Sequence, residues 1–152
     1  MKAMLALQVF LLRRNWMGSM GEYIMALTTT GRTSGRRIST PIGYLRDGDT
    51  IFAINPYGRS NWFKNMLANP AVELAIQGQT CKAYGELISD PAEIARVFEL
   101  YRQWQPAVFP RLFGITADAP QDQRIEARDS RKFVRFSLVN DRFASKPAPD
   151  SA

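Results

Sequence analysis

The sequence predicts an α+β domain built on a small antiparallel β-barrel of about six strands. Short runs rich in β-branched and aromatic residues recur along the 152-residue chain, and most are joined by glycine-containing turns. A capped amphipathic segment indicates a helix between two of them. A hydrophobic content of 45% is ordinary for a globular protein, so we expect residues 1–145 to form one domain and residues 146–152 a disordered tail.

The strands are expected mostly in hairpins. Asp47-Gly48 is the strongest hairpin signal, because a type I′ turn needs positive φ at both central positions. Gly78 is expected to turn a second hairpin, and Pro41 indicates an edge strand or a bulge. The expected strands are residues 22–29, 38–46, 50–55, 71–77, 79–89 and 131–139.

Helices are expected to cover the barrel. Residues 61–67 should form a short helix capped by Ser60 or Asn61. The capping box at residues 90–93 opens a helix that runs to about Trp104. Its apolar stripe comprises Ile94, Val97, Phe98 and Tyr101. Residues 105–123 indicate no more than a short helix around Phe109, Leu112 and Phe113.

The N-terminal segment is apolar over residues 3–12 except for Gln8, and Arg13, Arg14 and Trp16 follow. This run is too short to cross a bilayer, which needs about 20 apolar residues in a helix. We expect a helix over residues 1–16 that packs on the domain or over a pocket. Peripheral membrane contact through residues 3–16 is the alternative. A cytoplasmic protein is expected, with membrane association left open.

The chain has no histidine and one cysteine, Cys81. This composition excludes histidine-based triads, histidine-ligated zinc and intrachain disulfides, and no metal site is expected. Cys81 lies within an expected strand, where a small packed residue is the preferred interpretation. Any chemistry must therefore come from a cofactor or from Tyr, Ser, Asp, Glu and Lys side chains.

The positive charge is concentrated in the first third of the chain. Residues 1–46 carry seven Lys and Arg against one acid, Glu22, and so hold the whole net charge of +6. An anionic partner should dock there. A phosphorylated cofactor, an anionic membrane surface and nucleic acid are the candidates.

The segment Gly31–Arg37 is the candidate anion site. Its two glycines let backbone N–H groups converge, Thr33 and Ser34 add hydroxyl donors, and Arg32, Arg36 and Arg37 can clamp phosphate. A solvated hairpin turn is the alternative. The glycine spacing fits neither a P-loop nor a dinucleotide-binding turn. No aromatic residue stands among the arginines, so nucleic acid is not expected.

Two further sets of residues are candidates for chemistry. Trp62 and Asn65 are three residues apart, so on a helix they share a face that suits a flat heterocycle. Core packing of Trp62, with Asn65 fixing a loop, is the alternative. Tyr44, Tyr57 and Tyr101 are candidate neutral O–H donors, since an unperturbed tyrosine has a pKa of about 10.

Three motifs occur in order along the chain: Leu27 to Gly35, Pro41 to Gly48, and Asn61 to Pro70. Together they resemble the deazaflavin (F420)-dependent nitroreductase family of the split-β-barrel flavin and deazaflavin oxidoreductases. The resemblance implies a split barrel that binds coenzyme F420, a 5-deazaflavin with a phosphate and an oligoglutamate tail. It also implies hydride transfer from the reduced cofactor to a quinone, a nitroaromatic or an activated enone.

The resemblance also implies roles for individual residues. Arg32, Thr33, Ser34 and Gly35 match the phosphate-binding loop, with Arg36 and Arg37 as additional cations. Trp62 and Asn65 match the segment beside the ring. Asn55 falls where the family places a small polar residue near the ring. With Tyr44 and Tyr101, which are candidates by location only, it makes up the set of catalytic candidates. The chain departs from the family pattern at Thr33, Ile38 and Gly43, where lysine, arginine and tyrosine are typical.

Two other functions are compatible with these residues. An FMN-dependent reductase on the same barrel is one, although a single phosphate needs fewer cations. A non-catalytic deazaflavin-binding or carrier protein is the other. A small-molecule substrate is expected in either enzyme, and a homodimer is expected only by analogy with other split barrels.

Overall fold

The computed structural model describes residues 23–56 and 58–139. The helix expected over residues 1–16, the membrane contact expected through residues 3–16, the candidate Tyr57 and the tail at 146–152 lie outside the described residues. Within the described part of the chain, no helix is long and apolar enough to cross a membrane.

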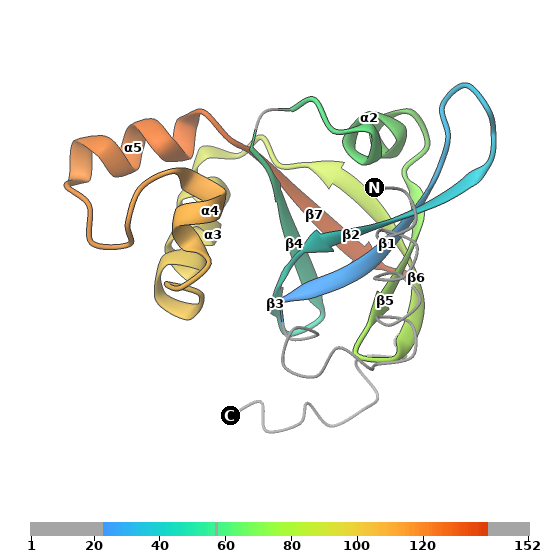
Figure 1. Cartoon of the computed structure of the whole chain (residues 1–152), viewed down its shortest axis with the longest axis horizontal. Coiled ribbons are helices and arrows are strands. Elements are labelled where there is room, and N and C mark those ends of the chain that lie inside the picture. The colour runs from blue at the N-terminus through green and yellow to red at the C-terminus, as the bar shows by residue number, and fades with distance from the viewer. Residues whose placement is uncertain (1–22, 57, 140–152) are drawn as a thin grey trace.

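One antiparallel sheet of seven strands curls into a half-barrel (Figure 1). Its order is β2-β1-β5-β6-β7-β4-β3, so β2 and β3 form the two edges. The strands are β1 (Ile24–Thr30), β2 (Arg37–Gly43), β3 (Leu45–Asp47), β4 (Thr50–Asn55), β5 (Ala71–Ile76), β6 (Gln79–Leu87) and β7 (Lys132–Leu138). The predicted antiparallel barrel with covering helices is confirmed.

The strand expected over residues 38–46 is two strands, β2 and β3, separated at Tyr44. The β2 strand pairs with β1, whereas β3 pairs with β4. The backbone N–H of Tyr44 donates to Tyr23 O at 2.8 Å, which ends the β1–β2 ladder and lets the chain turn toward β4. The hairpin with β4 therefore uses only Leu45–Asp47 of the run expected over residues 38–46. The sheet consequently has seven strands where about six were expected.

The two hairpin turns differ from each other. In the β3–β4 turn Asp47 pairs with Thr50, so Gly48 and Asp49 are the central residues. Only Gly48 has positive φ (63°), so the type I′ turn expected at Asp47-Gly48 is wrong. In the β5–β6 turn both Gln77 (φ 48°) and Gly78 (φ 82°) are left-handed, as a type I′ turn requires.

Four helices are described: α2 (Asn61–Ala68), α3 (Pro91–Trp104), α4 (Phe109–Phe113) and α5 (Gln121–Asp129). The α3 helix matches its expected range, and Asp90 accepts from Ala92 N at 3.2 Å. The other half of the capping box is absent, because Glu93 pairs instead with Arg135 of β7. The α5 helix was not anticipated, since its sequence is mainly polar.

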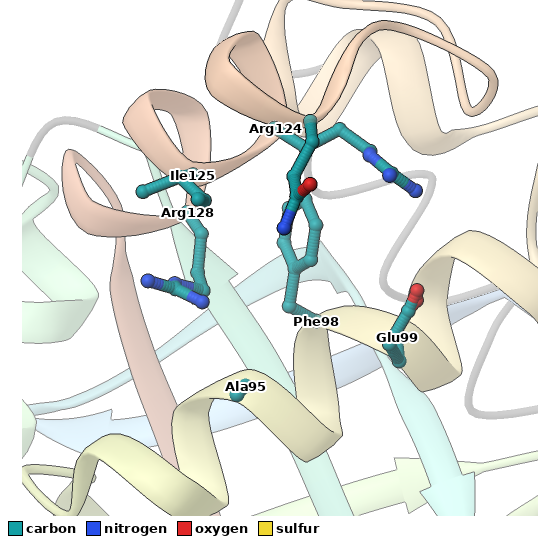
Figure 2. A pocket seen from close by; sticks show the side chains of 7 residues that line it. Ala95, Phe98, Glu99, Arg124, Ile125 and Arg128 are labelled. Carbon is teal, nitrogen blue, oxygen red and sulfur yellow. The ribbon is translucent and has the colours of Figure 1, made fainter.

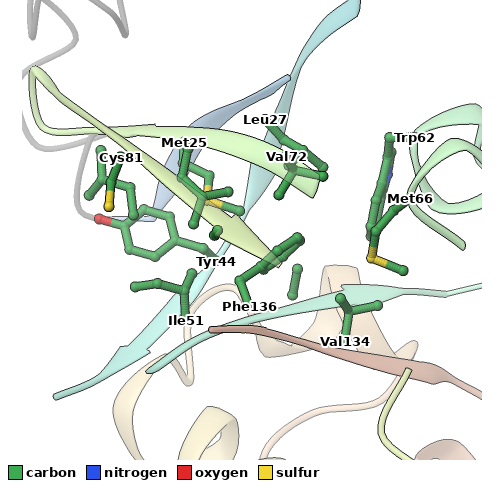
Figure 3. Close-up of a cluster of buried hydrophobic side chains, with 14 of the residues drawn as sticks. Met25, Leu27, Tyr44, Ile51, Trp62, Met66, Val72, Cys81, Val134 and Phe136 are labelled. Atoms are coloured by element: carbon green, nitrogen blue, oxygen red, sulfur yellow. The ribbon is translucent and has the colours of Figure 1, made fainter. Parts of the chain in front are cut away.

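Two hydrophobic clusters lie on opposite faces of the sheet. Ile51 and Ala53 of β4 face the barrel interior, and Phe52 and Ile54 face α3 and α4. The interior cluster also holds Cys81, packed as expected and 2% exposed (Figure 3). The second cluster contains the whole predicted stripe of α3. Helices α3, α4 and α5 thus cover one side of the half-barrel, and α2 covers one end (Figure 1).

Candidate functional site

Helix α2 is fixed over the barrel end by its apolar face. Trp62, Phe63 and Met66 are buried in the interior cluster (Figure 3). Met66 lies directly over Gly85 of β6, where an added Cβ would be 2.5 Å from Met66 Sδ. Glycine at this position thus leaves room for the Met66 side chain to pack on β6. This packing sets the position of the polar residues on the rest of α2.

The buried amide of Asn65 connects α2 to the β1–β2 connection. Its Oδ1 accepts from Arg32 N at 3.1 Å and from Arg32 Nη1 at 2.7 Å. Its Nδ2 donates to Thr29 Oγ1 at 3.4 Å. Arg32 Nη2 also donates to Asn61 Oδ1 at 3.3 Å. The Arg32 guanidinium is thus held beside the first turn of α2.

The Gly31–Arg37 segment folds into a tight loop that rises beside α2 (Figure 1). Gly31 N donates to Arg36 O at 2.7 Å, and Gly35 N donates to Gly31 O at 2.9 Å. Ser34 Oγ accepts from Arg36 N at 3.2 Å and occupies the space that a side chain at Gly31 would need, 2.5 Å from its Cβ position. Gly35 adopts a left-handed conformation with φ of 72°. Glycine at position 31 therefore leaves room for Ser34 Oγ, and glycine at position 35 permits the left-handed backbone.

The three arginines of the loop have different environments. Arg32 is bound by Asn65 and Asn61, as described above. Arg37 donates to Thr30 Oγ1 at 2.8 Å and lies 3.5 Å from a Glu73 carboxylate oxygen. The Arg36 guanidinium has no hydrogen-bond or ion-pair partner among the described residues, and it is exposed. Arg36 is therefore available to a ligand, whereas Arg37 is engaged by the sheet.

The N-terminus of α2 has no side-chain cap. Ser60 is the N-cap residue, but its Oγ donates to Asn55 Oδ1 at 3.1 Å and does not accept from the helix. The first-turn N–H groups of α2 therefore lack a capping acceptor from this side chain, and no acidic residue lies in that turn. A helix N-terminus of this kind favours an anion.

Asn55 ends β4 inside the barrel and is only 1% exposed. Its Nδ2 has no hydrogen-bond partner in the part of the chain that the structure describes. A buried donor without an acceptor costs about 1–3 kcal/mol, so a ligand acceptor at this point would be favourable. The structure thus brings Asn55 to the same end of the barrel as α2, through Ser60.

The polar groups around this barrel end are donors and cations. No acidic residue occurs between Tyr23 and Arg46, or between Thr50 and Val72. Arg32, Arg36, Arg59 and Lys64 all come from these stretches and are exposed. An extended anionic ligand suits this arrangement, because cations and hydrogen-bond donors predominate and the Glu73 carboxylate beside the loop is paired with Arg37.

Trp62 is largely buried. It is 8% exposed and packs edge-on to Phe63, with ring centroids 5.9 Å apart. The side-chain amide of Asn65 is hydrogen-bonded to Arg32 and Thr29. These contacts favour the alternative interpretation, in which Trp62 packs in the core and Asn65 fixes the loop, and contact of either residue with a cofactor ring stays a prediction.

Two predicted tyrosines lie in the core and apart from the loop. Tyr44 is 4% exposed among Met25, Ile51 and Cys81, at the far side of the interior cluster from Trp62 (Figure 3). Tyr101 belongs to the other cluster, and its OH donates to Phe52 O at 3.2 Å. Burial raises the pKa of Tyr101 well above its usual range. The structure does not bring either tyrosine together with Asn55.

Two pockets beside α5 are separate from this barrel end. One, of about 170 Å³, lies between α3 and α5 (Figure 2). It is lined by Ala95, Phe98, Glu99, Gln121, Arg124, Ile125 and Arg128. The other, of about 230 Å³, lies between α5 and the α4 end, at residues such as Phe113, Ala127 and Arg131. Neither is lined by a residue of the loop or of α2.

Arg32 and Asn65 were predicted from the sequence as site residues, whereas the residues that hold their side chains in place were not. Asn61 and Thr29 bind these two side chains, and Ser60 binds Asn55. The sequence signal that could have indicated them is the group of Asn, Ser and Thr residues at the end of β1 and at the start of α2. Such residues are common at helix starts, so that signal alone does not identify a site.

Comparison with known proteins identifies a protein family and similar solved structures. The profile of the F420H(2)-dependent quinone reductase family matches residues 10–112. A haem storage protein from Vibrio cholerae is similar in structure, with a TM-score of 0.55 and 13% identity over 90% of this chain and 91% of that chain. A FAD-binding protein from Mesorhizobium loti gives a TM-score of 0.51 and 14% identity over 89% and 90%.

An F420-H2 dependent reductase gives a TM-score of 0.48 and 18% identity over 75% of this chain and 93% of that chain. At these identities the two matches with a TM-score above 0.5 establish the fold alone. A search of curated proteins found no match. The family profile covers more than half of the chain and includes the loop, Asn55 and α2. The chain therefore belongs to the F420H(2)-dependent quinone reductase family, and it is an F420H2-dependent reductase.

Proposed function

We propose that this reductase holds F420 across the barrel end formed by the Gly31–Arg37 loop, the first turn of α2 and Asn55, and that it reduces a quinone. Nitroaromatics and activated enones are the other acceptor classes that we expect it to accept. The observation that carries the proposal is the double hydrogen bond from Arg32 to Asn65, which holds a cation beside an uncapped helix N-terminus.

The residues at this barrel end fit F420. The cofactor carries a phosphate and carboxylates, and the loop offers two exposed arginines. Among the described residues, the Arg36 guanidinium has no partner, and Arg32 is hydrogen-bonded only to neutral amides, which leave its charge uncompensated. The hydroxyl groups of Thr33 and Ser34 are exposed in the same loop. The orphaned Nδ2 of Asn55 supports a further acceptor atom at the barrel mouth. The stretches that supply these residues contain no acid, and the Glu73 carboxylate beside the loop is paired with Arg37.

When bound, reduced F420 supplies a hydride to the acceptor, and the protein supplies binding, orientation and electrostatics. In this proposal Arg32, Arg36 and the loop N–H groups bind the anionic tail. Asn55 Nδ2 donates a hydrogen bond at the ring end, which fixes the orientation of the flat heterocycle. Among Asn55, Tyr44 and Tyr101, only Asn55 lies beside α2, so we assign the polar role near the chemistry to Asn55.

Turnover with different acceptors tests the proposed reaction. Oxidation of F420H2 is followed optically with a short-chain quinone, a nitroaromatic and an activated enone in parallel. We expect the highest kcat/KM with the quinone, and we expect Asn55→Ala to lower kcat/KM. Asn69→Ala, at the exposed C-cap of α2, is the control and should leave it unchanged. Equal rates for Asn55→Ala and the native chain would remove Asn55 from the proposal.

A further inference from the structure

Lys132 is placed at the same barrel end as Asn55. It is the first residue of β7, and it lies directly opposite Asn55, the last residue of β4. Residues that face each other across an antiparallel pair point to the same side of the sheet. Val134 and Phe136, at two-residue intervals from Lys132, are both in the interior cluster. The Lys132 side chain therefore leaves the sheet on the interior face, at the barrel mouth.

The stem of Lys132 lies against the connection between β4 and α2. Gly58, with φ of 67°, is in this connection, and a Cβ there would be 3.5 Å from Lys132 Cγ and 3.8 Å from Cε. Both distances place the stem of Lys132 beside the Gly58 backbone. Lys132 as a whole is exposed, so its ammonium group is open to a ligand at the barrel mouth.

Lys132 has no carboxylate to neutralise it among the described residues. No ion pair or hydrogen bond involves its ammonium group there. The nearby Asp129 pairs with Arg128, at 2.9 Å between Nε and Oδ1. The same barrel end holds the buried Asn55 Nδ2, which lacks an acceptor among these residues. A cation and an amide donor thus occupy neighbouring positions on one face, and neither is satisfied by the described part of the chain.

We propose that Lys132 is a cofactor-binding residue that acts with Asn55 Nδ2 on an oxygen of the deazaflavin ring. This inference rests on the proposed function, because it assumes that F420 occupies this barrel end. The tail is assigned to the loop beside Arg32, whereas Lys132 lies opposite Asn55 at the end of β4. We therefore assign Lys132 to the ring end of the cofactor. Lys132 lies outside the residues that the family profile matches, so the profile does not indicate it.

Binding measurements with two ligands test this assignment. The variant Lys132→Met keeps the apolar stem and removes the charge. Lys82→Met makes the same change at an exposed lysine of β6 and is the matched control. Each protein is titrated with oxidised F420 and with the deazaflavin riboside that lacks the phosphate and the glutamates. The readout is the dissociation constant from tryptophan fluorescence, and urea midpoints establish that the variants are folded.

We expect Lys132→Met to weaken both ligands by about 10- to 100-fold, the range for a lost hydrogen bond to a charged group. Lys82→Met should bind both as the native chain does, and Lys132→Arg should recover part of the loss. Unchanged affinity of Lys132→Met for the riboside would overturn the assignment, whether or not F420 binding falls. If the native chain itself does not bind F420, the proposed function fails, and that outcome is distinct from a failure at Lys132 alone.

Discussion

Asn65 of α2 holds Arg32 of the β1–β2 loop through a single amide oxygen, which accepts from both the backbone N–H and the guanidinium of that arginine. The amide is buried, and its other end donates to Thr29 of β1. One side chain therefore joins a strand, a loop and a helix. The position of the Arg32 cation is set before any ligand arrives, which lowers the entropic cost of binding.

Removing the Asn65 amide should affect both stability and affinity. Asn65→Ala leaves the buried Thr29 hydroxyl and the Arg32 N–H without their partner. We expect a loss of about 1–3 kcal/mol in the free energy of unfolding, and weaker F420 binding because Arg32 is no longer held. Urea denaturation and fluorescence titration measure the two effects. Asn69→Ala on the same helix should change neither, and a native-like affinity for Asn65→Ala would show that Arg32 needs no support.

The two neighbouring arginines of the loop should behave differently. Arg36 has no partner among the described residues, whereas Arg37 is engaged by Thr30 and Glu73. Arg36→Ala should therefore weaken F420 by about 10- to 100-fold, as for a hydrogen bond between charged groups. Arg37→Ala should cost less affinity. Isothermal titration at low ionic strength measures both, and a larger loss for Arg37→Ala than for Arg36→Ala would reverse the assignment.

Two left-handed glycines offer a matched comparison. Gly35 in the loop and Gly48 in the β3–β4 hairpin both have positive φ and open space at the Cβ position. Alanine at either should cost about 1–2 kcal/mol of stability through backbone strain alone. Only Gly35→Ala should also weaken F420, because only that turn belongs to the proposed site. Thermal unfolding and ligand titration give the two readouts, and equal affinities for the two variants would argue against the loop.

Tyr101 should behave as a structural residue. Burial raises its pKa, so the folded state keeps the proton at a pH where the unfolded chain loses it. The folded state therefore keeps its full stability, as far as Tyr101 is concerned, below about pH 10, the ordinary tyrosine pKa. Above that value the free energy of unfolding falls as pH rises, because the unfolded chain loses the Tyr101 proton first. Tyr101→Phe should lose about 1 kcal/mol at neutral pH, through the hydrogen bond to Phe52 O, and should reduce this alkaline slope.

Activity separates the structural role of Tyr101 from a catalytic one. Since Tyr101 lies in the cluster under α3, Tyr101→Phe should keep the native kcat with F420H2 and a quinone. A fall in kcat without a change in stability would restore Tyr101 as a catalytic candidate. Denaturant titrations at several pH values and initial rates are the measurements.

Most of the sheet could be predicted because its signals are local. The β4 strand was predicted with its observed ends, and the start and end of α3 followed from the Asp90 cap and the amphipathic stripe. The break at Tyr44 could not be predicted, since it depends on the strand leaving β1 for β4, a long-range choice. The α5 helix was missed because its composition is polar and only Ala127 is buried.

The residues that make up the candidate site could largely be predicted from the sequence, but the role of each residue could not. The charge distribution and the glycines indicated the loop. The helical spacing of Trp62 and Asn65 could not reveal that one packs in the core and the other binds Arg32. Lys132 was not singled out, because its proximity to Asn55 comes from pairing between strands 77 residues apart in the sequence.

Arg32 is the cation proposed to bind the F420 tail. The direct measurement is the dissociation constant of F420 for the native chain and for Arg32→Ala, at low and at high ionic strength. We predict weaker binding for Arg32→Ala, with the difference largest at low salt, where a contact between charges is least screened. Dissociation constants that are equal for the two proteins at low salt would contradict the account and leave the loop as a turn alone.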